Sequence, residues 1–144
     1  MADTIRWDMA GAELLGSAKV TISTATTTSF DFGTPDDINL AGEANYDHGD
    51  RLLVVLSAST GGTTDSLTWV IQDANDSSGS IGTPATALTS FITGALAETT
   101  GDAFTVAAVR LQPARPWLRV RVTSSGATDT FVTHCMVLAV PSNV

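Results

Sequence analysis

A chain of 144 residues has the length of one domain and can bury a hydrophobic core without staples; its single cysteine excludes an intramolecular disulfide. The net charge of −8 argues against nucleic acid as a partner, because nucleic-acid binding needs a basic surface. No apolar stretch approaches the length of a membrane span, and charged residues interrupt the first twenty, so we expect neither a membrane segment nor a signal peptide.

The composition favours strands over helices. Only 15% of the residues are charged, and serine and threonine make up roughly a quarter of the chain. Threonine suits half-exposed strands, whereas lysine and glutamate suit helices, and Lys19 is the only lysine. These proportions predict an all-β protein, and the absence of a disulfide framework fits folding in a reducing cytosol.

The first residues form a segment of their own. Ile5, Trp7 and Met9 alternate with polar residues over a short stretch, which is the period of a strand. Residues 1–18 are therefore expected either as an N-terminal arm that lays Trp7 against a neighbouring subunit or as an edge strand. Residues 19–144 are expected to form a single β-sandwich domain. An apolar stripe this short is poorly suited to solvent, which favours a homo-oligomer, with a dimer preferred over a trimer.

The remaining chain reads as short strands separated by turn residues. The expected strands cover residues 19–24, 28–32, 51–57, 67–72, 88–93, 104–111, 117–122 and 130–140. Residues 34–37 and 46–50 are expected as turns, and residues 57–66 and 73–84 as loops. The continuous apolar run of residues 52–56 indicates a strand buried on both faces. Strands at this spacing predict an antiparallel β-sandwich that is jelly-roll-like.

The alternation of apolar and polar residues also predicts which side chains form the core. The expected core includes Leu52, Val54, Leu56, Leu67, Trp69, Ile71, Leu118, Val120, Val122 and Met136.

No motif in the chain carries recognisable catalytic or metal chemistry. His134 and Cys135 are neighbours, but on a strand they point to opposite faces and cannot share a metal or form a nucleophile–base pair. The aspartates lie among Gly, Asn, Pro and Ser, where they ordinarily stabilise turns. Calcium held by Asp73, Asn75 and Asp76 is the best alternative, although the Glu and Gly of an EF-hand loop are missing. We expect no enzyme activity, no metal and no cofactor.

The charges are unevenly distributed along the sequence. Residues 1–105 carry a net charge of −11, and residues 106–144 carry a net charge of +3 from Arg110, Arg115, Arg119 and Arg121 against one aspartate. Arg119 and Arg121 alternate with apolar residues and so point away from the core. They form either a solvated face or ion pairs across an interface; the second is favoured because arginine is the preferred interfacial cation.

Several stretches together resemble a known family. They are Phe30-Asp31-Phe32-Gly33, residues 50–55, residues 67–73, Arg110-Leu111, residues 116–122 and residues 137–141. In order and spacing, over about residues 12–141, the chain resembles the small capsid cement (decoration) proteins of short-tailed phages, a family typified by the cement protein of a Bordetella phage. The stretches are strand framework, so the resemblance carries over no catalytic residue.

The resemblance implies a jelly-roll-like sandwich that oligomerises on the outer surface of a virion. Its partner would be the major capsid protein, whose subunits it would bridge and stabilise after synthesis in the host cytoplasm. The alternative from another class is a carbohydrate-binding or adhesin module. Such modules usually expose several aromatic side chains together, whereas the few aromatics here mostly follow strand patterns.

Overall fold

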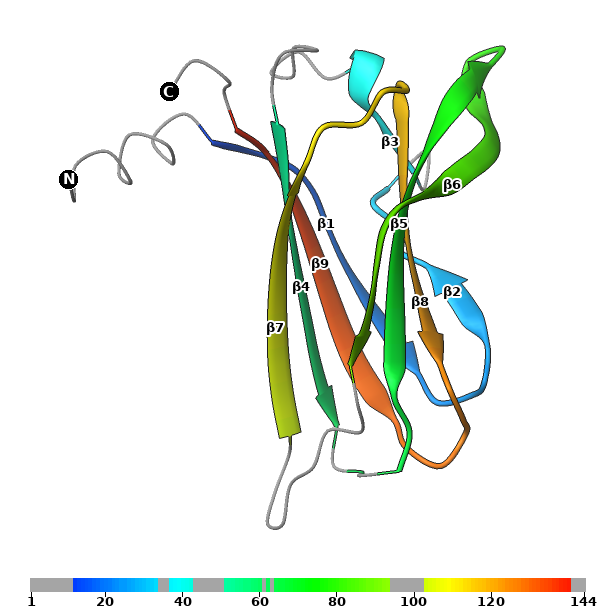
Figure 1. Ribbon diagram of the computed structural model, residues 1–144, viewed down its shortest axis with the longest axis vertical. Helices are drawn as coiled ribbons and strands as arrows, with labels where there is room; N and C mark the ends of the chain where they lie inside the picture. Colours follow the sequence, from blue (N-terminus) through cyan, green and yellow to red (C-terminus); the bar gives the residue numbers. More distant parts are fainter. Residues whose placement is uncertain are drawn as a thin grey trace, which may run out of the picture.

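The computed structural model describes residues 12–33, 37–42, 51–60, 62, 64–93 and 103–140, which form two antiparallel β-sheets packed face to face (Figure 1). A four-stranded sheet has the order β1-β9-β4-β7, and a five-stranded sheet has the order β2-β8-β5-β6 with β3 also pairing with β8. The elements are β1 (Glu13–Ile22), β2 (Thr27–Ser29), β3 (Ile38–Asn39), the 3₁₀ turn η1 (Leu40–Gly42), β4 (Arg51–Thr60), β5 (Leu67–Ser77), β6 (Ser80–Thr93), β7 (Ala103–Leu111), β8 (Trp117–Ser124) and β9 (Phe131–Val140).

Each sheet is assembled from strands that are distant in sequence. The first described strand, β1, pairs with the last, β9, and β4 lies between β9 and β7. In the other sheet β8 lies between β2 and β5. This is the strand order of a jelly roll, in which the chain passes repeatedly from one sheet to the other. The predicted all-β, antiparallel, jelly-roll-like sandwich is confirmed.

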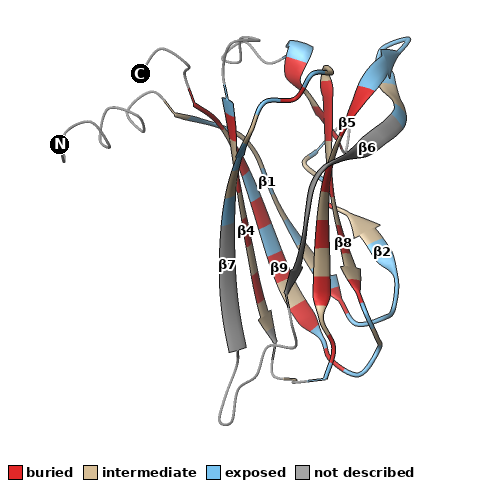
Figure 2. Ribbon diagram, viewed as in Figure 1, coloured by how far each residue is buried: buried red, intermediate tan, exposed pale blue. Residues whose placement is uncertain are grey.

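The core lies between the sheets, and the strands that line it alternate buried and exposed residues (Figure 2). The residues predicted for the core are buried, with one exception. Met136 is 43% exposed, so its assignment to the core was wrong. Cys135 and Val137 on either side of it are buried, and successive side chains of a strand point to opposite faces, so Met136 points outward.

The apolar run in β4 is buried on only one face. Leu52, Val54 and Leu56 are fully buried, whereas Leu53 and Val55 point outward and are partly exposed. The prediction of burial on both faces was therefore wrong for the single chain. An antiparallel sheet of a sandwich covers its inner face only, and its outer face usually carries polar residues. Leu53 and Val55 depart from that pattern.

The expected loop at residues 73–84 is instead the end of a long hairpin. Strand β5 continues to Ser77 and β6 starts at Ser80, joined by Ser78 and Gly79, whose φ angles are 56° and 83°. Positive φ at both central residues is the signature of the tight type I′ hairpin turn. Polar composition made this segment resemble a loop, although its backbone remains paired.

Strand boundaries near the N-terminus also differ from the expectation. Strand β1 begins at Glu13, well before the expected start at residue 19, so the proposed division of the chain after residue 18 falls inside it. Residues 1–11 lie outside the described residues, and their role as an arm stays a prediction. The expected turn at residues 46–50 also lies outside them.

Two buried aspartates join the loop before β5 to the connection between β8 and β9. Asp129 accepts hydrogen bonds from the backbone N–H groups of Thr64 and Asp65, both at 2.7 Å. Asp65 accepts reciprocally from the N–H groups of Thr128 and Asp129, both at 2.8 Å. We call this pair the aspartate clasp. It satisfies four backbone donors with two carboxylates and ties together loops that are more than sixty residues apart.

Candidate interaction surface

The outer face of the four-stranded sheet carries a group of exposed and partly exposed apolar side chains. Leu14, Leu138 and Leu53 lie in register across β1, β9 and β4, and Met136 and Val55 form the neighbouring row. Leu14 is 58% exposed and Met136 is 43% exposed. We call these five residues the apolar face. Contiguous exposed apolar side chains on a folded domain typically mark an interaction site.

The apolar face is bordered by polar and charged groups. Beyond Met136 and Val55, the register brings Lys19, His134 and Ser57 into one row, and a shallow hollow lies between these residues and the apolar face. At the other end Arg110 pairs with Leu53 across β7 and β4, and both Arg110 and Arg51 are exposed.

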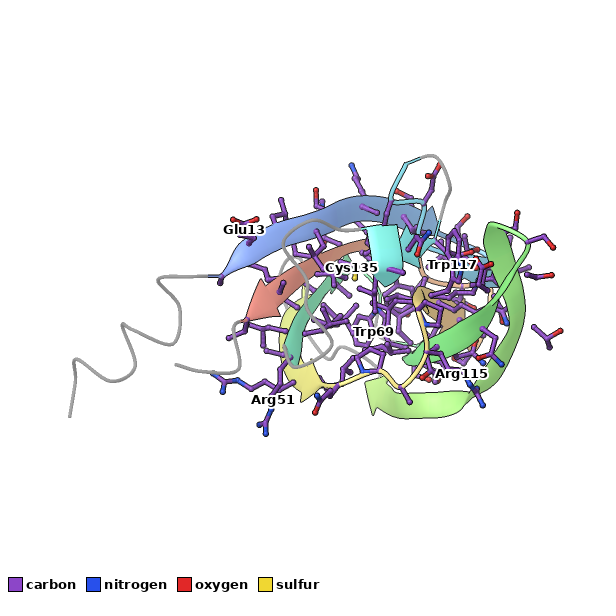
Figure 3. The ribbon with its side chains drawn as sticks, turned by 90° about the horizontal axis from the view of Figure 1, so that it is seen from above. Glu13, Arg51, Trp69, Arg115, Trp117 and Cys135 are labelled. Atoms are coloured by element: carbon purple, nitrogen blue, oxygen red, sulfur yellow. The ribbon has the colours of Figure 1, made fainter. Side chains whose placement is uncertain are left out.

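Seen from above, the labelled Glu13 and Arg51 lie on the outside of the four-stranded sheet (Figure 3). Glu13 projects from the start of β1, and Arg51 projects from the start of β4 (Figure 3). Cys135 and Trp69 point instead into the space between the sheets (Figure 3). The outer surface of this sheet therefore has Glu13 at the start of β1, Lys19 further along the same strand, and arginines at its β4 and β7 side.

The outer face of the five-stranded sheet is polar and largely satisfied within the chain. Arg119 donates two hydrogen bonds to Asp37, from Nε to Oδ1 at 2.9 Å and from Nη2 to Oδ2 at 2.7 Å. The side chain of Asp37 is 6% exposed, and that of Arg119 is 25% exposed. This bidentate, charge-assisted geometry is the strong form of the interaction. The acidic partner of Arg119 is thus in its own chain.

Two further contacts bind the β7–β8 connection and the start of β8 to strand β5. Arg115 lies 3.5 Å from Asp73, which also accepts a hydrogen bond from the N–H of Ala114. The indole N–H of Trp117 donates to Asp76 at 2.9 Å. The backbone N–H of Gly79, followed by this indole, lowers the pKa of the Asp76 carboxyl. Asp73 and Asp76, proposed above as alternative calcium ligands, accept hydrogen bonds from protein donors.

Arg121 differs from its neighbour two residues earlier. Its Nε is buried without a hydrogen-bond partner, and no carboxylate of the described part of the chain lies within 4.0 Å of its guanidinium. Its side chain is only partly exposed on the outer face of the five-stranded sheet. A partly exposed arginine with no carboxylate beside it in the described structure is suited to an acidic partner supplied from outside.

The four arginines proposed for an interface do not gather on one surface. Arg119 and Arg121 lie on the outer face of the five-stranded sheet, Arg110 lies on the opposite side of the sandwich, and Arg115 precedes β8. Their interfacial role stays a prediction, as does that of Ile5, Trp7 and Met9, which lie outside the described residues. The sequence interpretation missed the apolar face, although the apolar residues on both faces of β4 signalled it.

The remaining candidate groups are separated as the strand pattern predicted. His134 is exposed and Cys135 is fully buried, so the expectation that they point to opposite faces is confirmed. Burial raises the pKa of the Cys135 thiol, which disfavours the reactive thiolate. Within the described ranges, no three His, Cys, Asp or Glu side chains converge as metal ligands, and no helix is long and apolar enough to cross a membrane.

No family model matches the chain, and no curated protein does. Among solved structures it is similar to PirA, with a TM-score of 0.49 and 14% identity over 83% of this chain and 92% of that one. It is also similar to the PBSX exported protein XepA, with a TM-score of 0.49 and 12% identity over 88% of this chain but only 36% of that one. A chain of the cyanophage Pam1 capsid gives a TM-score of 0.42 and 14% identity over 90% of this chain and 85% of that one. None of these TM-scores reaches 0.5, so the similarities carry no argument about function.

Proposed function

We propose that this protein is a structural component of a phage particle, a cement protein that binds the outside of the assembled capsid. The observation that carries the proposal is a jelly roll with two contact surfaces, the exposed apolar face on one sheet and the partly exposed Arg121 on the other, while its buried carboxylates serve internal contacts. Such a molecule works through surface contact. The resemblance of its strand framework to phage cement proteins supplies the kind of partner, the major capsid protein.

The proposed mechanism is binding without catalysis. A protein that binds only the assembled shell stabilises it by mass action, because dissociation of the shell must also release the bound protein. Many copies, each with a modest interface, add their effects when every copy bridges neighbouring capsid subunits. The proposal includes a homo-oligomer, with a dimer preferred, located on the virion surface after synthesis in the host cytoplasm.

The geometry of Arg121 suggests how one contact to the shell is made. Arg121 is partly exposed and has no carboxylate partner among the described residues, so its charge is available to a carboxylate of the capsid protein. Arg119 provides the matched control on the same strand face, because its charge is already neutralised by Asp37. Arg121→Gln should therefore weaken capsid binding while leaving the fold intact, and more strongly at low salt.

The test is co-sedimentation of the purified protein with empty capsids from virions in which its band is found. Saturable binding and later heat release of DNA from decorated than from bare virions support the proposal. Equal heat release with and without the protein, or no binding to shells, would refute it. A glycan array run in parallel tests the carbohydrate-binding alternative, to which the buried Trp69 and Trp117 offer no platform.

A further inference from the structure

We infer that the apolar face of the four-stranded sheet is the contact between two copies of this chain, related by a two-fold axis parallel to the strands. The inference rests on the proposal that the protein is a homo-oligomer, and it does not require that the capsid be the partner. Four observations on the described residues support it: the apolar character, the register, the charges and the size of the face.

The apolar character sets this face apart from the other outer face. Leu53 and Val55 interrupt the polar alternation expected of a solvated sheet face, and Leu14 and Met136 are the exposed large hydrophobic residues of the described chain. On the five-stranded sheet the corresponding outward positions of β5 and β8 hold Thr68, Val70, Gln72, Arg119, Arg121 and Thr123. The middle of the outward side of β4, at Leu53 and Val55, is thus apolar where the outer face of a sandwich usually carries polar residues.

The register makes the face self-complementary about one axis. A two-fold axis parallel to the strands, between β9 and β4, exchanges these two strands in the facing copy. Leu138 then lies opposite the second copy's Leu53, Met136 lies opposite its Val55, and the polar row with His134 and Ser57 faces itself. An axis across the strands through the middle of the sheet would instead set the apolar rows over polar ones.

The charges at the borders agree with the same axis. It places β1 of one copy over β7 of the other, because these are the two edge strands of the sheet. The exposed Glu13 at the start of β1 is then brought toward the exposed Arg110 and Arg51 of the second copy. Two such opposite-charge pairings arise per dimer, one at each side of the apolar face.

The whole outer surface of the four-stranded sheet, of which the apolar face is one part, is large enough for a dimer interface. Four strands about 4.8 Å apart and about ten residues long at about 3.3 Å each give a flat area of about 600 Å². Side-chain relief adds to that area, which brings it near the roughly 800 Å² per partner of a standard interface. No segment from elsewhere in the described chain covers it.

The experiment measures association of the full chain by sedimentation velocity. Met136→Glu places a charge opposite the second copy's Val55 and should weaken self-association at least ~100-fold. Val55→Lys should do the same for the reciprocal reason. Because each side chain is already partly exposed, both variants should remain folded by far-ultraviolet dichroism. Ala25→Glu, which adds the same charge at an exposed position before β2, is the control and should leave the dimer unchanged.

Mixing the two variants gives the sharpest result. In the proposed arrangement the glutamate introduced by Met136→Glu in one chain faces the lysine introduced by Val55→Lys in the other. An equimolar mixture should therefore form a heterodimer although neither variant self-associates. A monomeric wild type, a dimer that survives Met136→Glu, or a mixture that stays monomeric would overturn the inference.

Capsid binding is scored separately, so the failure of one proposal can be told from the failure of the other. Loss of capsid binding by Met136→Glu from a monomeric wild type would overturn the dimer and assign the face to the shell. A wild-type protein that forms the dimer but does not bind capsids would refute only the proposed function.

Discussion

Removing one carboxylate of the aspartate clasp tests how much this link between two loops contributes to the free energy of unfolding. Asp129→Ala leaves the backbone N–H groups of Thr64 and Asp65 without their acceptor. Asp65 is 5% exposed, so its N–H group loses a charge-assisted hydrogen bond with little access to water, at a cost of about 1.5–3 kcal/mol. Thr64 is exposed, so water replaces much of its loss. We expect a total destabilisation of about 3 kcal/mol.

The assay is urea denaturation followed by tryptophan fluorescence, because the fully buried Trp69 reports on the core. In a parallel thermal scan, the unfolding entropy of a 144-residue chain, about 0.3 kcal/mol/K, converts a loss of about 3 kcal/mol into a fall in Tm of about 10 °C. Asp129→Asn keeps an oxygen acceptor without the charge and should cost about 1 kcal/mol. A loss below about 0.5 kcal/mol for Asp129→Ala, or equal losses for Ala and Asn, would refute the reasoning.

The reciprocal geometry also predicts coupling between the two carboxylates. Asp65→Ala opens the same pair of loops, so the double variant should lose less than the two single losses together. Gly62 belongs to the same structure: a Cβ at this position would overlap the carboxylate of Asp129. Gly62→Ala should therefore destabilise the protein, although Gly62 does not have the positive φ that disfavours alanine. An unchanged free energy of unfolding would contradict the close approach of Gly62 to Asp129.

Three further predictions concern single side chains. Arg119→Met strands the buried Asp37 and should cost about 2 kcal/mol in urea denaturation, whereas Arg121→Met should change stability by less than about 0.5 kcal/mol. Because burial raises the pKa of Cys135, the unfolded chain loses its thiol proton first; stability should fall above about pH 8.5 by up to about 1.4 kcal/mol per pH unit, and Cys135→Ala should remove that slope. The lowered pKa of Asp76 predicts hairpin stability that is present at neutral pH and lost as pH falls through the folded-state value; near-ultraviolet dichroism in an acid titration measures it, and Asp76→Asn should abolish it.

The sequence predicted the antiparallel sandwich and its inward-facing residues but not where the strands begin and end. Alternation in Leu67, Trp69 and Ile71, and again in Leu118 and Val120, identifies inward faces because each strand is paired on both sides and packs on one face. The polar residues 73–84 were mistaken for a loop because they lack this alternation. Backbone hydrogen bonds, which composition does not reveal, keep β5 and β6 paired beyond their apolar parts.

The candidate site was harder to predict because its contacts join distant residues. The separation of negative and positive charge along the chain suggested an intermolecular contact, yet Arg119 meets Asp37 eighty-two residues away within the domain. The order of residues in a sequence does not reveal which charged side chains are in contact in the folded protein. One local pattern in the sequence does indicate an interaction surface. Leu53 and Val55 alternate with core residues at positions where polar residues would suffice, and in the described structure they remain partly exposed.

The two proposals use different outer faces of the sandwich, one for self-association and the other for capsid binding. A dimer formed through the four-stranded sheets would cover the apolar face and leave the five-stranded sheets on its two outer sides. Each side would then present one copy of Arg121, because this residue lies on the outer face of the five-stranded sheet. Two identical polar faces pointing away from a shared axis give a bivalent molecule, and bivalency is what bridging two capsid subunits requires. Self-association through one sheet therefore supplies the geometry that a cement function needs from the other.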